Sequence, residues 1–134
     1  GAELWIDGGH NPGAGKVIAE AMATLNDRDS RPLFLITGMI NTKDPVGYFD
    51  AFAGMARHVF TVPVSESEAG LDPEFLADTA DEAGLTAESA PDVETAIATI
   101  CKNWNRLERP PRILIGGSLY LLGEVLKANG TPPD

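Results

Sequence analysis

Three short stretches of this sequence combine glycine with side chains that could bind an anion or move a proton. They are "DGGHNP" at 7–12, "GMINTKD" at 38–44 and "GGSLY" at 116–120. In the first stretch, Asp7 could accept hydrogen bonds from a ribose or an ammonium group, and His10 could donate one to a phosphate or a carboxylate. Asn11 and Pro12 favour the start of a helix, whose free N–H groups attract anions. A tight strand-to-helix turn with a capping asparagine is the structural alternative.

The same stretch comes close to a phosphate-binding P-loop but lacks two of its chemical requirements. A P-loop has a glycine, four further residues, and then Gly-Lys followed by Ser or Thr. Gly15 and Lys16 could supply the Gly-Lys pair, but His10 occupies the position of the first glycine. Val17 follows Lys16, so no hydroxyl is present for a magnesium ion. The sequence therefore predicts a different kind of site.

The other two stretches are ambiguous when each is taken alone. Lys43 could pair with a phosphate, while Asp44 beside it could simply cap a helix. Ser118 is most simply the N-cap of a final helix that ends near Ala128. The argument for function comes from their shared position, because each of the three stretches follows a predicted strand.

Apolar runs and helix-start signals alternate along the chain and predict the elements that hold these stretches. Strands are expected at 4–7, 33–38, 58–64, 85–89 and 112–117, and helices are expected to begin at 12, 45, 73, 92 and 118. We expect Val17, Val46 and Phe75 to lie on the buried faces of their helices. Five strand–helix units predict an α/β fold: a Rossmann-like, three-layer α/β/α domain with a mostly parallel sheet.

In such a sheet, ligands bind beyond the carboxyl ends of the strands. All three stretches would lie at that edge. We therefore expect Asp7, His10, Lys43 and Ser118 to project from one edge of the sheet, on strands that are central or adjacent.

Composition narrows the classes of function. The 134 residues suit one domain, and the single cysteine, Cys101, fits a reducing cytoplasm. No apolar run approaches the length of a membrane helix. The net charge is −10, and no Lys or Arg lies between His58 and Cys101, where ten acidic residues fall. Such an acidic surface repels nucleic acid and anionic membranes, so neither is expected as a partner.

The three stretches together resemble a known family. "LWIDGGHNPGAGKVIAEAM" is similar to the "DGAHNP" segment that opens the carboxyl-terminal domain of folylpolyglutamate synthases and dihydrofolate synthases, in the Mur ligase superfamily. "GMINTKD" and "ILIGGSLYLLGEVL" resemble two later segments of that domain, in the same order and spacing. The sequence departs from the pattern at Gly9, where alanine is usual, and at Asn41 and Thr42, where an aspartate often precedes the lysine.

The resemblance implies an ATP-dependent acid–amino-acid ligase. Such an enzyme adds L-glutamate to dihydropteroate, to reduced folates or to both, through an acyl-phosphate intermediate. Residues 1–134 would be a single carboxyl-terminal (glutamate ligase) domain of a larger cytoplasmic enzyme, which we expect to be a monomer. The amino-terminal P-loop ATPase domain, which binds most of the Mg²⁺, would be absent, so we expect this chain alone to be inactive.

The resemblance also implies roles for single residues. It gives His10 a catalytic role, assigns Ser118 to glutamate, provides no metal ligand in this chain, and assigns ATP contacts to Asp7, Gly8, Gly9, Asn11 and Lys43. Two other functions stay open. The chain could be a stand-alone nucleotide- or anion-binding module, or the carboxyl-terminal domain of a cell-wall Mur ligase.

Overall fold

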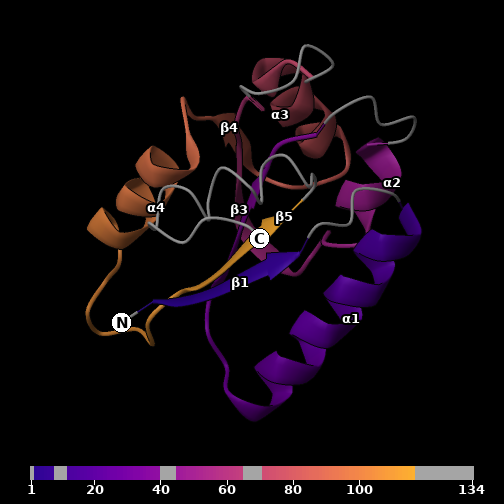
Figure 1. The fold of residues 1–134 in the computed structure, drawn as a ribbon. Helices are drawn as coiled ribbons and strands as arrows, with labels where there is room; N and C mark the ends of the chain where they lie inside the picture. Colours follow the sequence, from indigo (N-terminus) through magenta and orange to yellow (C-terminus); the bar gives the residue numbers. More distant parts are fainter. Residues whose placement is uncertain (1, 8–11, 40–44, 65–70, 117–134) are drawn as a thin grey trace, which may run out of the picture.

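A computed structural model describes residues 2–7, 12–39, 45–64 and 71–116, and its elements alternate as the sequence predicts (Figure 1). The final helix predicted from Ser118 lies outside these ranges. The elements are β1 (Glu3–Asp7), α1 (Pro12–Arg28), β2 (Leu33–Thr37), α2 (Pro45–Asp50), β3 (Ala56–Thr61), α3 (Pro73–Glu82), β4 (Ala87–Ser89), α4 (Val93–Lys102) and β5 (Arg112–Gly116).

The five strands form one sheet in the order β1-β5-β2-β3-β4, and each neighbouring pair is parallel. The last strand in the chain, β5, therefore lies between the first two. Strands β2 and β5 are two of the predicted strands, and side chains on both of their faces are buried. Leu35, Ile36, Ile113 and Leu114 are fully buried.

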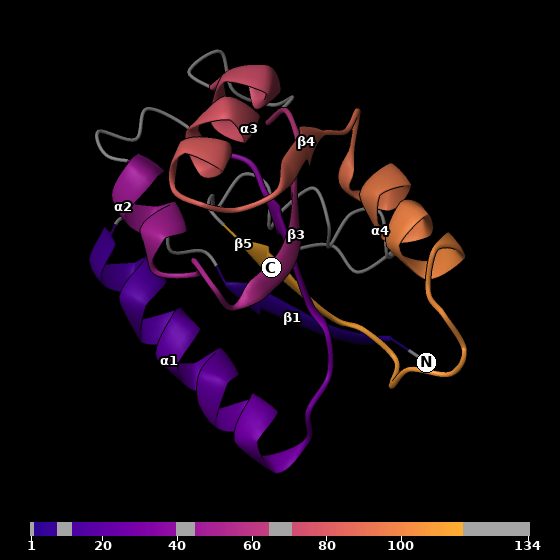
Figure 2. The ribbon, with the colours of Figure 1, turned by 180° about the vertical axis from the view of Figure 1, so that it is seen from behind.

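Helices cover both faces of the sheet, which gives the predicted three layers (Figures 1 and 2). Helices α1, α2 and α3 lie on one face, where Met22, Phe49 and Leu76 pack with Leu35. Helix α4 lies on the other face, where Ile100 joins a second cluster that includes Ile36, Phe60, Ile113 and Ile115. In the described part of the chain, no helix is long and apolar enough to span a membrane.

Two helices begin where the sequence predicts, and the capping interactions show why. The Asp72 carboxylate accepts a hydrogen bond from the Glu74 amide at 3.1 Å, and Pro73 follows as the first helical residue. The Asp92 carboxylate accepts one from the Thr95 amide at 2.6 Å. This bond from the Thr95 amide lowers the pKa of Asp92. Each cap satisfies a helix N–H group that would otherwise lack a partner.

Several side chains predicted to be buried are exposed. Phe75 is 51% exposed, Val46 39% and Val17 69%, whereas the adjacent Leu76 is completely buried. In these helices apolar residues occur on more than one face, so periodicity alone does not fix which face meets the sheet. Trp5 is 39% exposed on β1, which lies at the edge of the sheet.

Candidate functional site

The three strands that precede the candidate stretches are neighbours, and their carboxyl ends meet. Asp7, the last residue of β1, pairs in register with Gly116, the last residue of β5. Gly116 also pairs with Thr37, the last residue of β2. The prediction that these strands are adjacent is therefore confirmed. Chain segments that leave three neighbouring strands at one edge can contribute to a single site.

The predicted site residues fall mainly in the segments that follow these strand ends. Asp7 closes β1 at the shared edge. The other six lie outside the described residues, so their roles stay predictions: Gly8, Gly9, His10, Asn11, Lys43 and Ser118.

Helix α1 begins at Pro12, five residues after the end of β1, and its first turns pack closely on α2. A Cβ atom on Gly15 would lie 3.1 Å from Cδ1 of Tyr48 and 3.2 Å from its carbonyl oxygen. Glycine thus lets the two helices approach closely here, and a larger residue would need the Tyr48 region to shift by a few tenths of an ångström. Lys16, the next residue, has an exposed side chain on α1. The glycine of this Gly-Lys pair therefore has a role in helix packing, and the lysine lies on the exposed surface of α1.

A second glycine fixes the end of β2. A Cβ atom on Gly38 would lie 2.8 Å from the carbonyl oxygen of Val62, closer than real Cβ contacts. On either side of Gly38, the Thr37 carbonyl accepts a bond from the Val62 amide at 2.9 Å, and the Met39 carbonyl accepts one from the Leu71 amide at 2.8 Å. These contacts hold the chain against the segment after β3 as it leaves the sheet toward "INTKD".

Thr37 is a residue of this edge that the sequence analysis missed. Its side chain is fully buried, and its hydroxyl oxygen has no hydrogen-bond partner among the residues that the structure describes. The corresponding residue of β3, Thr61, is also buried, but its hydroxyl donates to the Pro73 carbonyl at 2.6 Å. An unpaired buried hydroxyl is destabilising. The available signal was a polar residue that ends the apolar run "LFLI" just before Gly38.

The edge suits a nucleotide better than a metal ion. Main-chain ends, the amino end of α1 and a buried hydroxyl offer the hydrogen-bonding groups that ribose and phosphate oxygens use. No group of three or more His, Cys, Asp or Glu side chains placed to hold a metal ion occurs within the ranges that the structure describes.

A parallel sheet covered by helices on both faces defines the chain as a three-layer α/β domain. The particular family follows from its sequence: residues 1–118 match the model of the Mur ligase family, glutamate ligase domain. The chain belongs to this family. No curated protein sequence matches it.

Solved structures give the same fold. A Mycobacterium tuberculosis folylpolyglutamate synthase complexed with ADP and AMPPCP is 22% identical, with a TM-score of 0.79 over 98% of this chain. A Yersinia pestis bifunctional folylpolyglutamate synthase/dihydrofolate synthase complexed with AMPPNP and Mn is 20% identical, with a TM-score of 0.74 over 95% of this chain. The chain spans 30% and 28% of the length of these two proteins.

A cell-wall relative is less similar. A domain of a putative UDP-N-acetylmuramate:L-alanyl-gamma-D-glutamyl-medo-diaminopimelate ligase from Haemophilus ducreyi is 15% identical to this chain. The match covers 95% of this chain and 90% of that domain, with a TM-score of 0.56.

Proposed function

We propose that this chain is the carboxyl-terminal domain of an ATP-dependent ligase that adds L-glutamate to dihydropteroate, to reduced folates or to both. The observation that carries the proposal is the meeting of β1, β5 and β2 at one edge, in register at Asp7, Gly116 and Thr37. The sequence segments that resemble the folate branch of the family leave the sheet at these three points.

In this proposal, the edge forms one side of a cleft whose other side is an amino-terminal ATPase domain. ATP supplies the phosphoryl group that activates the acceptor carboxylate as an acyl phosphate, and the glutamate amine then displaces phosphate. Asp7 binds the ribose, and Gly8, Gly9, Asn11 and Lys43 complete the ATP contacts.

The remaining two residues, His10 and Ser118, lie where the phosphates and the incoming glutamate meet. His10 faces the phosphates or the glutamate amine, and Ser118 holds the glutamate. Closure of the cleft would bring the amine to the acyl phosphate and exclude water, which would otherwise hydrolyse it.

The known relatives support these partners without testing them here. One structure of a bifunctional folylpolyglutamate synthase/dihydrofolate synthase contains Mn, AMPPNP and L-glutamate together. We assign Mg²⁺ mainly to the amino-terminal domain, since the described residues of this chain provide no cluster of metal ligands. A monomer in the cytoplasm, with no nucleic-acid or membrane partner, remains our prediction.

Two alternatives make different predictions. A stand-alone nucleotide- or anion-binding module would bind ATP tightly without an ATPase domain. A cell-wall Mur ligase would accept a peptidoglycan precursor instead of a folate. The TM-score of 0.56 for the Haemophilus ducreyi domain, against 0.72 for the Thermotoga maritima folylpolyglutamate synthase, favours the folate branch.

The proposal is tested with the full-length enzyme that contains this domain. ADP release and glutamate ligation are measured with dihydropteroate and with a reduced folate as competing acceptors. We expect ligation with at least one of them, and none with the isolated 134-residue chain. Activity only on a peptidoglycan precursor would favour the cell-wall ligase. A dissociation constant for ATP below the micromolar range with the isolated chain would favour the stand-alone module.

Variants of the full-length enzyme test the roles of single residues. Asp7→Ala should raise the KM for ATP more than that for glutamate, and His10→Ala should mainly lower kcat, each by roughly 10- to 100-fold. Lys16→Ala is the control, because the exposed Lys16 belongs to the apparent P-loop but not to the proposed site. Normal kinetics with a lowered melting temperature in the Asp7 and His10 variants would make "DGGHNP" a structural turn.

A further inference from the structure

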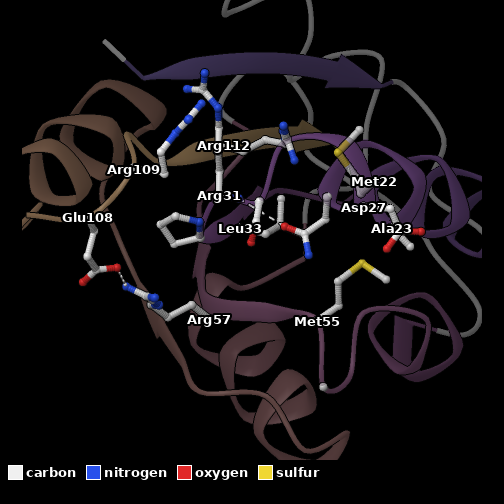
Figure 3. Close-up of a pocket in the computed structure, with 14 residues that line it drawn as sticks. Met22, Ala23, Asp27, Arg31, Leu33, Met55, Arg57, Glu108, Arg109 and Arg112 are labelled. Atoms are coloured by element: carbon white, nitrogen blue, oxygen red, sulfur yellow. Dashed lines mark hydrogen bonds and ion pairs between the residues drawn. The ribbon is translucent and has the colours of Figure 1, made fainter.

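A cavity of about 610 Å³ lies at the opposite edge of the sheet from the proposed ligase site (Figure 3). Leu33 and Arg112, the first residues of β2 and β5, contribute to its wall. Met22 from α1 and Met55 from the segment before β3 also line it. In a parallel sheet, strand starts and strand ends lie at opposite edges, so this cavity is separate from the edge that carries Asp7 and Thr37.

Arginine side chains dominate the polar lining of the cavity. The whole chain has ten Lys and Arg residues and a net charge of −10. Four of the ten line this one cavity: Arg31, Arg57, Arg109 and Arg112. They come from distant parts of the sequence, so the fold and not a local basic run brings them together.

Two of these arginines form the inner part of a fixed network. Arg112 is almost completely buried, and its Nε donates to a Glu3 carboxylate oxygen at 2.6 Å while its Nη2 donates to the Asp29 carbonyl at 3.1 Å. Arg31 Nε donates to the Asp29 carboxylate at 2.7 Å. The hydrogen bonds from Arg112 and Arg31 lower the pKa values of Glu3 and Asp29 respectively, so both carboxylates stay charged.

The other two arginines are held at the mouth of the cavity. Arg57 Nη1 donates to Glu108 at 2.8 Å, and Arg109 Nη2 donates to Asp29 at 2.5 Å. Their side chains are 54% and 60% exposed. Exposed ion pairs of this kind add little to stability, but they restrict the orientation of a long side chain.

These bonds use only part of the donor capacity. A guanidinium has five N–H donors, and each of the four arginines uses one or two nitrogens in hydrogen bonds within the described residues. The two terminal nitrogens of Arg31 have no hydrogen bond there. The cavity thus presents oriented N–H donors that match the oxygens of a carboxylate or a phosphate.

One wall of the cavity is apolar. Met22 is 2% exposed and Leu33 7% exposed, and both line the cavity beside Met55. Figure 3 shows Met22 and Met55 on the side opposite Arg57 and Arg109. A ligand that fills this space would place a charged group among the arginines and an apolar group against the methionines.

The charges favour a small anion over a large one. The four arginines are balanced by Glu3, Asp29, Glu108 and Asp27, so these eight residues are neutral together and the rest of the chain carries the net −10. A large polyanion would meet the acidic surface around the cavity, whereas a compact anion would meet mainly the guanidinium donors.

We propose that this cavity binds a small organic anion, with a phosphate or carboxylate group held by Arg57 and Arg109 and an apolar body against Met22 and Met55. The site is independent of the proposed ligase reaction. The whole 134-residue chain is therefore enough to test it, whatever the outcome of the ligase assays.

Phenyl phosphate is a suitable probe, because it carries both chemical features in a small molecule. The chain has three methionines, so ¹³C-methyl methionine NMR gives three signals. Met22 and Met55 report on the cavity, and Met39, which does not line it, is the internal control. Phenyl phosphate should shift the Met22 and Met55 methyl signals, whereas Met39, fully buried beyond the end of β2, should not move. Inorganic phosphate should bind more weakly, and phenol should not shift the Met22 or Met55 signals.

Substitutions then separate a defined site from general ionic attraction. Arg57→Gln and Arg109→Gln should each raise the dissociation constant about tenfold or more, because each removes a charge-assisted contact. Arg106→Gln is the matched control: Arg106 lies over the Trp104 ring, 4.2 Å from its centroid, and does not line the cavity. Its variant should bind phenyl phosphate like the parent chain.

Three results would overturn the proposal. The first is the absence of methionine shifts at 10 mM phenyl phosphate, and the second is an equal shift of Met39. The third is equal weakening by the Arg106 and Arg57 substitutions, which would indicate attraction to any surface cation. The backbone spectra of the Gln variants show whether the fold is retained, and Arg57 and Arg109 are both exposed enough for replacement without loss of core packing.

Discussion

Two buried threonines on neighbouring strands should respond in opposite ways to replacement by valine: one variant should be less stable than the parent chain and the other more stable. Thr37 and Thr61 pair in register at the carboxyl ends of β2 and β3, and both are fully buried. The Thr61 hydroxyl donates to the Pro73 carbonyl at 2.6 Å, whereas the Thr37 hydroxyl has no partner within the described part of the chain. Valine keeps the branched shape and the strand preference and removes only the hydroxyl.

The expected magnitudes follow from the hydrogen bonds. Thr61→Val loses one buried bond and should lower the free energy of unfolding by about 1 kcal/mol. Thr37→Val removes a hydroxyl that is desolvated without compensation, and should raise the free energy of unfolding by about 1 kcal/mol. The two variants should therefore differ by about 2 kcal/mol, or several degrees in Tm for a domain of this size.

Urea and thermal unfolding of the 134-residue chain measure this difference directly. Each variant serves as the control for the other, since the chemical change is identical and the positions are adjacent. Equal destabilisation by both substitutions would refute the reasoning, because it would mean that the Thr37 hydroxyl already has a partner. A stabilised Thr37→Val variant would instead identify a polar group kept at the proposed ligase site at the expense of stability, as is common at functional sites.

Three further predictions concern the framework around the two edges. Gly38→Ala should destabilise the chain by about 1–3 kcal/mol in urea unfolding, because the new Cβ would meet the Val62 carbonyl oxygen at 2.8 Å. Because the pKa values of Glu3 and Asp29 are lowered in the fold, the stability they contribute is complete at neutral pH and should be lost below about pH 4; a pH series of melting temperatures that stays flat there would contradict this. Asp92→Ala should cost about 1 kcal/mol through loss of the α4 cap, and Asp92→Asn should restore most of it.

The order of the elements was accessible from sequence because its signals are local. The apolar run at β2 predicts a strand buried on both faces, and Leu35 and Ile36 are fully buried. An aspartate before a proline predicts the start of α3, and the Asp72 carboxylate caps it. Each of these signals depends on residues within a few positions of one another.

Side-chain contacts between distant segments were not accessible in this way. No acidic residue lies near His58 in the sequence, yet its Nε2 lies 3.1 Å from a Glu88 carboxylate oxygen on the adjacent strand β4. Arg112 and Glu3 are 109 positions apart and form a bond at 2.6 Å. Such contacts depend on the strand order, in which β5 lies between β1 and β2, and the strand order is a property of the whole sheet.

Gly15 and Gly38 show that a glycine in a sequence motif can serve packing instead of ligand binding. Gly15 looks like part of a phosphate loop, but it lies inside α1 against Tyr48, where the absence of a side chain allows close packing of α1 on α2. Gly38 likewise allows β2 to pass close to Val62. Both glycines stabilise the elements that end at the candidate site, and neither has to touch a ligand. Chemistry at this edge is therefore expected from Asp7, and from the segments that leave β1, β2 and β5 together, more than from the glycine pattern itself.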